Sequence, residues 1–381
     1  MRLVNRLSRR DFFKIGIGCG IGLILGAFGI KNLLYEAPRP IDYPLATKEA
    51  TYYRKIGDDR VQCEVCFRRC IILEGERGFC TNRQNVGGRL YSLVYGRPCA
   101  IQIDPIEKEP QYHNLPGSSI LCLGTAGCNF KCIFCHNWHM STRTIDETGF
   151  EDLPPERAVE IAQTRGVEGV SFTYNEPTVF YEYMYDVARL AKKAGLRTLF
   201  HTNGSMNPEP LKELLKQIHA VTVDLKGFTP QFYKLISSSE IEKVKETLKL
   251  IHGEGVWLEI VNLMIPTLND DMKHVREMCM WIKENLGEEV PLHFSRFFPA
   301  YLLTNVPPTP IETLEKAAKV ASDVGLEYVT IGNVPGHKAN STFCPRCGER
   351  LVHRIHFKVQ ENSIREGRCR FCGHNIPGLW S

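Results

Sequence analysis

The chain has 381 residues, which is enough for two or three domains. Hydrophobic residues make up 43% of it and charged residues 24%, an ordinary globular composition that excludes a disordered, a collagen-like or a multi-span membrane protein. The net charge is +4, but seven basic and two acidic residues lie among the first 40, so the remainder is near −1 and carries no nucleic-acid footprint.

The amino terminus has the pattern of an export signal. Residues 8–14 are Ser-Arg-Arg-Asp-Phe-Phe-Lys, a twin-arginine sequence, and an uncharged run over residues 15–30 follows. A membrane-spanning helix needs about 20 strongly apolar residues, whereas this run is shorter and contains six glycines. We therefore expect a Tat-like signal or membrane leader at residues 1–35 and a proline-containing linker at residues 36–50.

Four cysteines then fall within twenty residues, and we predict a cysteine-rich metal-binding domain at residues 51–117. In a chain of this length such close spacing indicates metal or redox centres and not a disulfide framework. Four thiolates fit either zinc or an auxiliary iron–sulfur cluster, and their number does not discriminate between the two. The predicted ligands are Cys63, Cys66, Cys70 and Cys80.

From about residue 119 onward, short β-branched or apolar runs alternate with amphipathic helical patterns, which predicts βα units around a parallel sheet. Six or seven units are too few for a closed eight-fold barrel, so we predict an α/β fold with a partial (βα)6 parallel barrel over residues 118–340. The predicted strands span residues 120–124, 169–173, 197–201, 220–225, 257–265, 291–297 and 328–331. The predicted helices span residues 155–164, 179–194, 210–218, 240–252, 272–285 and 311–324.

The loop after the first of these strands carries Cys128, Cys132 and Cys135 with the spacing C-x3-C-x2-C. Three thiolates can hold three irons of a 4Fe–4S cluster and leave the fourth iron open to an outside ligand. A structural zinc site would need a fourth ligand, which His136 or His139 could supply. The spacing and the place after a barrel strand favour the cluster.

This triad resembles the signature of radical S-adenosylmethionine (SAM) enzymes, and the resemblance extends over about residues 118–335. It implies that the triad is catalytic and holds a 4Fe–4S cluster whose open iron binds the amino and carboxylate groups of SAM. Reductive cleavage of SAM then yields a 5′-deoxyadenosyl radical that abstracts a hydrogen atom from the substrate.

The resemblance also implies cofactor contacts at the ends of the predicted strands. Glu176 would accept from the SAM ammonium group. Alternation along an extended strand places Asp224 and Lys226 on one face, toward the SAM ribose and carboxylate. Each feature has an ordinary alternative. Glu176 could lie in a solvated turn, Asp224 and Lys226 could form an ion pair with a helix, and His293 could be a hydrogen-bonded core residue. The implied contacts are Phe134, Asn175, Glu176, Thr202, Asn203, Asp224, Lys226 and His293.

The resemblance is more specific in four short segments, which are similar to the radical SAM enzyme of the AmmeMemoRadiSam system. That enzyme is itself similar to pyruvate formate-lyase activating enzyme. The segments are residues 104–110, 135–138, 174–178 and 332–337. This implies Memo-like and AMMECR-like partner proteins, a cytoplasmic electron donor, and an unidentified substrate that could be a glycine on a partner protein. Two alternatives remain: radical modification of a small molecule or RNA, and a non-catalytic iron–sulfur electron carrier or metal-binding assembly protein.

The carboxy-terminal residues 341–381 have the spacing of a zinc ribbon, C-x2-C-x21-C-x2-C, with ligands at Cys344, Cys347, Cys369 and Cys372. This segment has seven basic and three acidic residues, a mild excess that fits a solvated surface better than a nucleic-acid interface. SAM and low-potential reductants are cytoplasmic, whereas the leader resembles an export signal. We therefore expect a membrane-associated protein with its catalytic domain on the cytoplasmic side.

Overall fold

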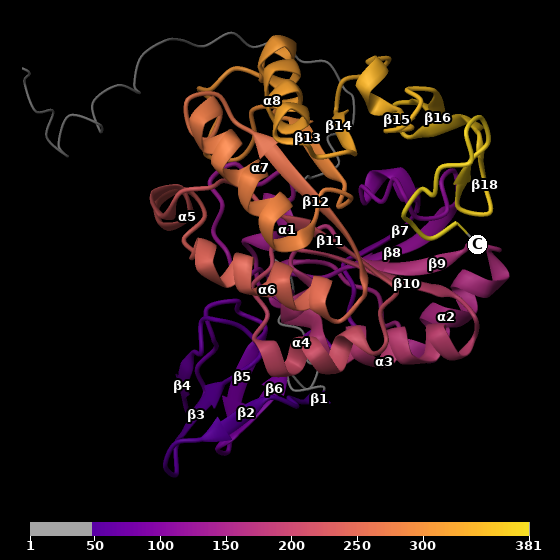
Figure 1. The fold of residues 1–381 in the computed structure, drawn as a ribbon. Coiled ribbons are helices and arrows are strands. Elements are labelled where there is room, and N and C mark those ends of the chain that lie inside the picture. The colour runs from indigo at the N-terminus through magenta and orange to yellow at the C-terminus, as the bar shows by residue number, and fades with distance from the viewer. Residues whose placement is uncertain (1–47, 381) are drawn as a thin grey trace, which may run out of the picture. The chain divides into compact units, whose positions relative to one another are not determined.

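The computed structural model describes residues 48–380 (Figure 1). The predicted leader at residues 1–35 and most of the predicted linker at residues 36–50 lie outside the described residues. Between residues 48 and 380, no helix is both long and apolar enough to cross a membrane.

An eight-stranded sheet forms the centre of the fold, in the order β14-β13-β12-β11-β10-β9-β8-β7. Neighbouring strands are parallel except β7, which runs antiparallel to β8. The predicted α/β class with a mostly parallel sheet is confirmed. The strands are β7 (Ala100–Pro105), β8 (Ser119–Gly124), β9 (Gly169–Phe172), β10 (Arg197–Thr202), β11 (Ala220–Asp224), β12 (Trp257–Met264), β13 (Leu292–Arg296) and β14 (Val329–Gly332).

The seven predicted strands are β8 to β14, and each agrees to within one residue at either end. Strand β7 was not predicted from the sequence. It is a partly exposed edge strand that carries Gln102, Asp104 and Pro105, residues without a strong preference for strands. Its pairing with β8 brings the segment that follows it over the central sheet.

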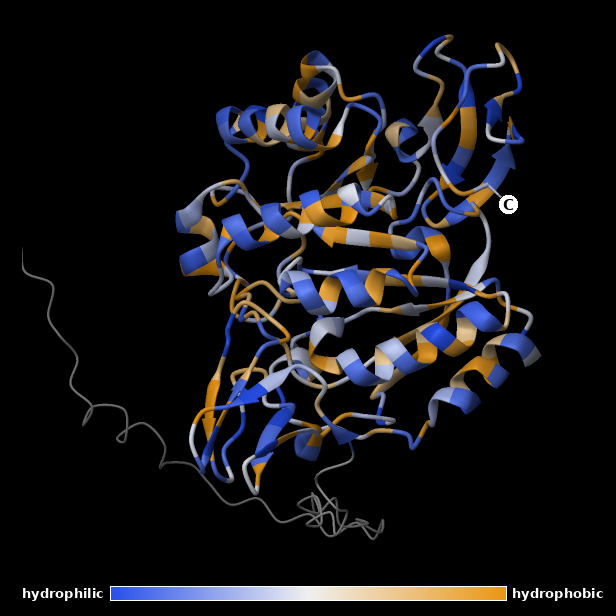
Figure 2. Cartoon of the chain, turned by 60° about the horizontal axis from the view of Figure 1, so that its bottom comes forward, coloured by the Kyte–Doolittle hydropathy of each residue, from blue (hydrophilic) through white to orange (hydrophobic). Residues whose placement is uncertain are grey.

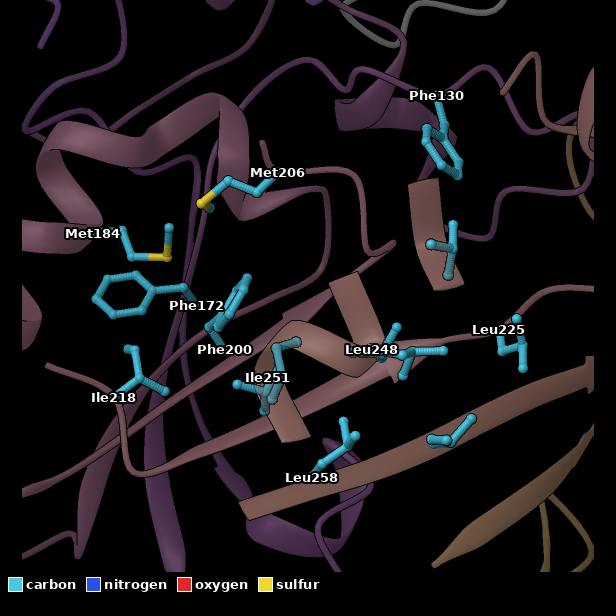
Figure 3. Close-up of a cluster of buried hydrophobic side chains, with 14 of the residues drawn as sticks. Phe130, Phe172, Met184, Phe200, Met206, Ile218, Leu225, Leu248, Ile251 and Leu258 are labelled. Carbon is cyan, nitrogen blue, oxygen red and sulfur yellow. The ribbon is translucent and has the colours of Figure 1, made fainter. Parts of the chain in front are cut away.

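The parallel strands are buried because helices and loops cover both of their faces, which explains their continuous apolar runs. Strand β9 is buried along its whole length. Phe172 from β9 and Phe200 from β10 pack in one hydrophobic core with Met184, and Figure 3 shows these three side chains close together.

Amphipathic helices follow most of the strands, and Figure 2 shows hydrophilic and hydrophobic residues side by side along them. Asp271 begins α7 by accepting from the backbone N–H of Lys273 at 2.8 Å, and Gly325 ends α8 with a φ of 100°. The six predicted helices are present, and the short α1 and α5 are additional. The helices are α1 (Trp138–Ser141), α2 (Pro155–Thr164), α3 (Tyr181–Lys193), α4 (Pro208–Leu215), α5 (Pro230–Ile236), α6 (Ile241–Gly253), α7 (Met272–Leu286) and α8 (Ile311–Val324).

The cysteine-rich segment before the central sheet forms two small antiparallel sheets, β1-β6-β5 and β2-β3-β4. A buried ion pair ties it to α3: the Arg83 guanidinium donates to both carboxylate oxygens of Glu182, at 2.8 and 3.0 Å. The strands are β1 (Lys48–Glu49), β2 (Tyr53–Lys55), β3 (Arg60–Cys63), β4 (Ile71–Leu73), β5 (Arg83–Val86) and β6 (Arg89–Ser92).

The carboxy-terminal segment forms two more small antiparallel sheets. The buried Arg354 fastens it to the segment after β7 by donating to the backbone oxygen of Tyr112 at 2.6 Å. Leu379 adds a backbone hydrogen bond to the oxygen of His113 at 2.7 Å. The strands are β15 (Thr342–Phe343), β16 (Arg350–Ile355), β17 (Lys358–Asn362), β18 (Ile364–Arg365) and β19 (Arg368–Cys369).

Candidate active site

A cavity of about 420 Å³ lies at the carboxyl ends of the central strands. Thr173 directly follows β9, Thr202 ends β10 and Asp224 ends β11, and all three line it. Folds built from parallel βα units place their ligands at this end of the sheet. Ten of the eleven residues expected to hold the cluster or SAM line the cavity: Cys128, Cys132, Phe134, Cys135, Asn175, Glu176, Thr202, Asn203, Asp224 and Lys226.

The cysteine loop after β8 is held by two features. Gly127 has a φ of 75°, and a Cβ at this position would collide with the backbone oxygen of Cys80, so only glycine fits. Asn175 accepts from the backbone N–H of Thr125 at 3.1 Å and donates to the backbone oxygen of Gly127 at 2.7 Å. Asn175 therefore acts on the shape of the loop that presents the cysteines.

Burial affects the protonation of two of the triad thiols, Cys132 and Cys128. Burial raises the pKa of Cys132 to about 11, although the nearby Lys226 ammonium lowers it in part. Burial, followed by the charge of Glu176, also raises the pKa of Cys128. Without a metal these thiols stay protonated at neutral pH, so metal binding must displace their protons.

The arrangement of donors fits a cluster better than a single ion. In residues 48–380, the triad contributes to no set of three or more ligand atoms within 4.8 Å of one another, and neither His136 nor His139 completes one. A mononuclear zinc site needs four ligands close together. Three separated thiols around one cavity match a cluster that keeps one iron open.

Glu176 is a buried carboxylate whose position is fixed by four donors. Its Oε1 accepts from the backbone and hydroxyl of Thr178, at 3.0 and 2.5 Å, and from the hydroxyl of Thr202 at 2.8 Å. Its Oε2 accepts from the backbone N–H of Asn203 at 2.7 Å. Burial still raises the pKa of Glu176, which is 2% exposed and forms no ion pair within the described chain. A cationic group of a ligand would complete this site.

Asp224 and Lys226 form an ion pair on the wall of the cavity, with 2.7 Å between Oδ2 and Nζ, and His201 lies 3.0 Å from the other carboxylate oxygen. Burial would raise the pKa of Asp224, but Lys226 and His201 outweigh it and hold that pKa well below its usual range. Leu225 is fully buried in the core. The predicted alternation of these side chains is therefore confirmed.

Three further expected residues also reach the cavity. Phe134 is 4% exposed, and the Lys226 ammonium lies 6.0 Å from the centre of its ring. The side chain of Thr202 bonds to Glu176, and that of Asn203 donates to Asn129 at 2.9 Å. Thr202 and Asn203 thus position the carboxylate and the cysteine loop.

His293 does not reach the cavity, which corrects its expected place beside the SAM carboxylate. It is the second residue of β13 and so lies near the amino end of the strand, whereas Ser295 lines the cavity. Both of its ring nitrogens are engaged, one with Glu259 at 2.7 Å and the other with Thr330 at 2.6 Å. His293 is therefore a hydrogen-bonded core residue, the alternative that the sequence left open.

Sequence reasoning missed several groups that line the cavity. His201 ends a predicted strand but received no role, and Glu109 comes from the segment after β7. Glu109 is 3% exposed, and its Oε2 has no hydrogen-bond partner. Tyr174 has a φ of 72°, rare for an aromatic residue, and donates to Asp104 at 2.6 Å. Glu109 and Asp104 reach the cavity through the pairing of β7 with β8, which the sequence alone did not reveal.

The four carboxy-terminal cysteines do form a compact metal-ligand group. Their sulfurs all lie within 4.8 Å of one another, with 3.7 Å between Cys344 and Cys372 and 3.8 Å between Cys347 and Cys369. Around one tetrahedral zinc ion, with Zn–S bonds of about 2.3 Å, sulfurs lie about 3.8 Å apart. This group can therefore bind a single metal ion.

The four cysteines near the amino terminus line a pocket of their own, apart from the cavity at the strand ends. Cys63 is buried, whereas Cys66, Cys70 and Cys80 are partly exposed. Their sulfurs do not form a compact ligand group within the described chain.

Comparisons with known proteins agree with this site. The family model of the Radical SAM superfamily matches residues 123–279. An uncharacterized protein of Methanocaldococcus jannaschii is 45% identical over 331 residues, which cover 86% of this chain and 98% of that protein. The pyruvate formate-lyase-activating enzyme of Clostridium pasteurianum is 27% identical over 166 residues, or 41% of this chain and 66% of that enzyme.

Among solved structures, a domain of the pyruvate-formate lyase-activating enzyme from Bacteroides vulgatus matches 43% of this chain and 99% of that domain, with 17% identity and a TM-score of 0.39. The family match covers the triad loop and the ends of strands β9 to β11, where the cavity lies. The chain belongs to the radical SAM superfamily and is an enzyme that cleaves SAM by a radical mechanism.

Proposed function

We propose that this enzyme holds a 4Fe–4S cluster on Cys128, Cys132 and Cys135, binds SAM across the ends of β9 to β11, and abstracts a hydrogen atom from a protein substrate. The observation that carries the cofactor assignment is the buried Glu176 carboxylate, which lines the same cavity as the three thiols and lacks a cationic partner among the described residues. An amino group carried by the ligand would supply that charge.

The cofactors supply the chemistry when bound: one-electron reductive cleavage of SAM to methionine and a 5′-deoxyadenosyl radical. The chain's own residues bind SAM and orient it. Glu176 is preorganised by its four donors to accept from the SAM ammonium. The Lys226 ammonium, held by Asp224, is available to the SAM carboxylate, and Phe134 offers an apolar face to the adenine.

The substrate proposal rests on the relatives and on the open side of the cavity. Relatives named pyruvate formate-lyase-activating enzyme act on a protein by their names, and we assign this chain the same kind of substrate, with a glycine as the modified residue. The remaining wall carries Asp104 and Lys108, which are charged groups suited to contacts with a polypeptide backbone or side chain.

The carboxy-terminal four-cysteine group is assigned to zinc in this proposal. The sulfur separations of 3.7 and 3.8 Å support one tetrahedral ion, and the spacing supports a zinc ribbon. Zinc would fix the carboxy-terminal segment, whose Arg354 and Leu379 contact the segment that follows β7. Its role would be structural.

The experiment is anaerobic reconstitution of the full chain with iron and sulfide, reduction with dithionite, addition of SAM, and measurement of 5′-deoxyadenosine. We expect its formation in the wild type and in Cys99→Ala, an isolated cysteine outside all three groups, and its loss in Cys132→Ala. A wild-type chain that binds a cluster but forms no 5′-deoxyadenosine would contradict the proposal and favour the electron-carrier alternative.

A further inference from the structure

The amino-terminal cysteines line a second pocket. Strand β3 and the loops before and after β4 supply the four thiols, and all four line one pocket. The rest of its wall is mostly apolar, with Val65, Ile72, Phe79 and Val179 among its side chains. Packing alone does not require four cysteines around one pocket, because other small apolar residues would fill the same space. The gathering of four free thiols therefore points to a bound metal centre.

The three cysteine groups of this chain differ in how closely their sulfurs gather, and the difference separates single ions from clusters. The carboxy-terminal sulfurs lie within 4.8 Å of one another, as they must around one zinc ion. In residues 48–380, no three of the amino-terminal sulfurs meet this condition, and neither do the three of the triad. A cube of iron and sulfide holds its cysteines further apart than one ion does, because each thiolate binds a different iron.

The amino-terminal group thus shares the open spacing of the triad, which the superfamily assigns to a cluster. It also has the complete four-thiolate set that a cluster without an open iron requires. Arg68 lines the pocket and favours an anionic centre there, whereas Arg83, which also lines the pocket, is paired with Glu182.

A thin wall separates this pocket from the cavity at the strand ends. Asn129 and Thr178 line the amino-terminal pocket, while their neighbours Cys128 and Glu176 line the SAM cavity. The backbone oxygen of Cys80 packs so closely against Gly127 that no side chain fits between them. The two cysteine groups therefore lie close together in one folded unit.

We propose that Cys63, Cys66, Cys70 and Cys80 bind a second iron–sulfur cluster, adjacent to the triad, and not a zinc ion. This decides between the two alternatives that the thiolate count left open. It does not depend on SAM cleavage, because it concerns a different set of ligands.

The test uses the full chain with the triad removed, as Cys128→Ala/Cys132→Ala/Cys135→Ala, purified and reconstituted anaerobically. We expect about two or about four irons per chain with an equal amount of sulfide, the contents of the two cluster types held by four cysteines. Reduction should give an electron paramagnetic resonance (EPR) signal that SAM does not alter. Triad-free protein that carries zinc in place of iron and sulfide at this group, or no metal beyond that of the carboxy-terminal group, would overturn the proposal.

Two matched variants in the triad-free background show which cysteines hold the iron. Cys63→Ser/Cys66→Ser should lose iron and sulfide but keep the carboxy-terminal metal, which also shows that the chain is folded. Cys344→Ser/Cys347→Ser should keep the iron. Retention of iron and sulfide in the first variant would contradict the assignment.

A further measurement compares the wild type with two variants that each lack one cysteine group, the triad-free protein and Cys63→Ser/Cys66→Ser in the wild-type background. If both clusters are present close together, the EPR spectrum of the fully reduced wild type should show broadening by magnetic interaction. It should therefore differ from the sum of the spectra of the two single-group variants. A spectrum equal to that of the triad cluster alone would contradict the proposal.

Discussion

The ammonium group of Lys226 lies 2.7 Å from Oδ2 of Asp224, and both side chains line the cavity that holds the triad. Burial would lower the pKa of Lys226, but Asp224 outweighs it and keeps this pKa above its usual value. The ammonium therefore stays charged at neutral pH. A fixed cation at this point can contribute to binding of an anionic group.

Replacing Asp224 by Asn should weaken SAM binding. Asn at this position no longer holds the Lys226 ammonium by a full charge. A charge-assisted hydrogen bond from that ammonium to the SAM carboxylate is worth about 1.5–3 kcal/mol, so its loss would raise the dissociation constant for SAM by roughly ten- to a hundredfold. The measurement is equilibrium binding of SAM to the reconstituted protein. Asp323→Asn is the control, since it breaks an exposed Lys–Asp pair at 2.9 Å on α8 and should leave binding unchanged. Equal affinities for both variants would contradict the assigned role.

Gly127→Ala should damage the cysteine loop. A side chain at this position collides with the backbone oxygen of Cys80, and the φ of 75° adds strain for any residue other than glycine. We expect the unfolding free energy to fall by at least about 1 kcal/mol and the triad to retain less iron. Gly149→Ala is the control, because nothing lies within 4 Å of its added Cβ. Wild-type iron content in Gly127→Ala would be the contrary result.

His293→Gln should leave SAM binding within about twofold of the wild type. The reason is that His293 lies outside the cavity and bonds to Glu259 and Thr330. The loss of these buried contacts should instead cost about 1–3 kcal/mol of unfolding free energy. Denaturant unfolding and SAM binding, measured on the same preparation, separate the two effects. A large loss of SAM affinity without a loss of stability would restore the role first expected from the sequence.

The stability of the fold should decrease as the pH falls from about 6.5 to about 4. Burial lowers the pKa of His113 to about 4, an effect that Glu259 partly offsets and Arg354 reinforces. In this range the unfolded chain binds a proton at His113 that the folded chain does not, so protonation favours unfolding. The contribution of this one residue is about 3 kcal/mol across the range.

His113→Gln is the variant that isolates this effect. Its unfolding free energy, measured by urea titration at several pH values, should fall less steeply with acid than that of the wild type. Identical slopes for the two proteins would show that His113 is not the group responsible.

The sequence predicted those parts of the structure that depend on local patterns. Strands β8 to β14 follow from apolar runs, because strands of a parallel sheet are buried on both faces. The triad follows from the spacing of three cysteines on one loop. Asp224 and Lys226 follow from alternation along one strand.

Features that depend on pairing between distant segments could not be predicted. Glu109 reaches the cavity only because β7 pairs antiparallel with β8. His293 was misplaced because its role at the cavity came from the resemblance, although the predicted strand over residues 291–297 already puts it near the amino end of that strand. Its partner Glu259 is on the neighbouring strand β12, 34 residues away in sequence. The separation of the sulfurs in the amino-terminal group could not be predicted from the sequence either. The sequence gives only the number of thiolates, which fits zinc and iron alike.

The most direct test of the central claim is a titration of SAM into the reduced protein, followed by EPR. If the open iron of the triad cluster binds SAM and Glu176 accepts from its ammonium group, SAM should change the cluster spectrum of the wild type. Glu176→Gln should then require roughly tenfold more SAM for the same change, because it loses the carboxylate charge. A cluster spectrum that SAM does not alter in the wild type would contradict the account.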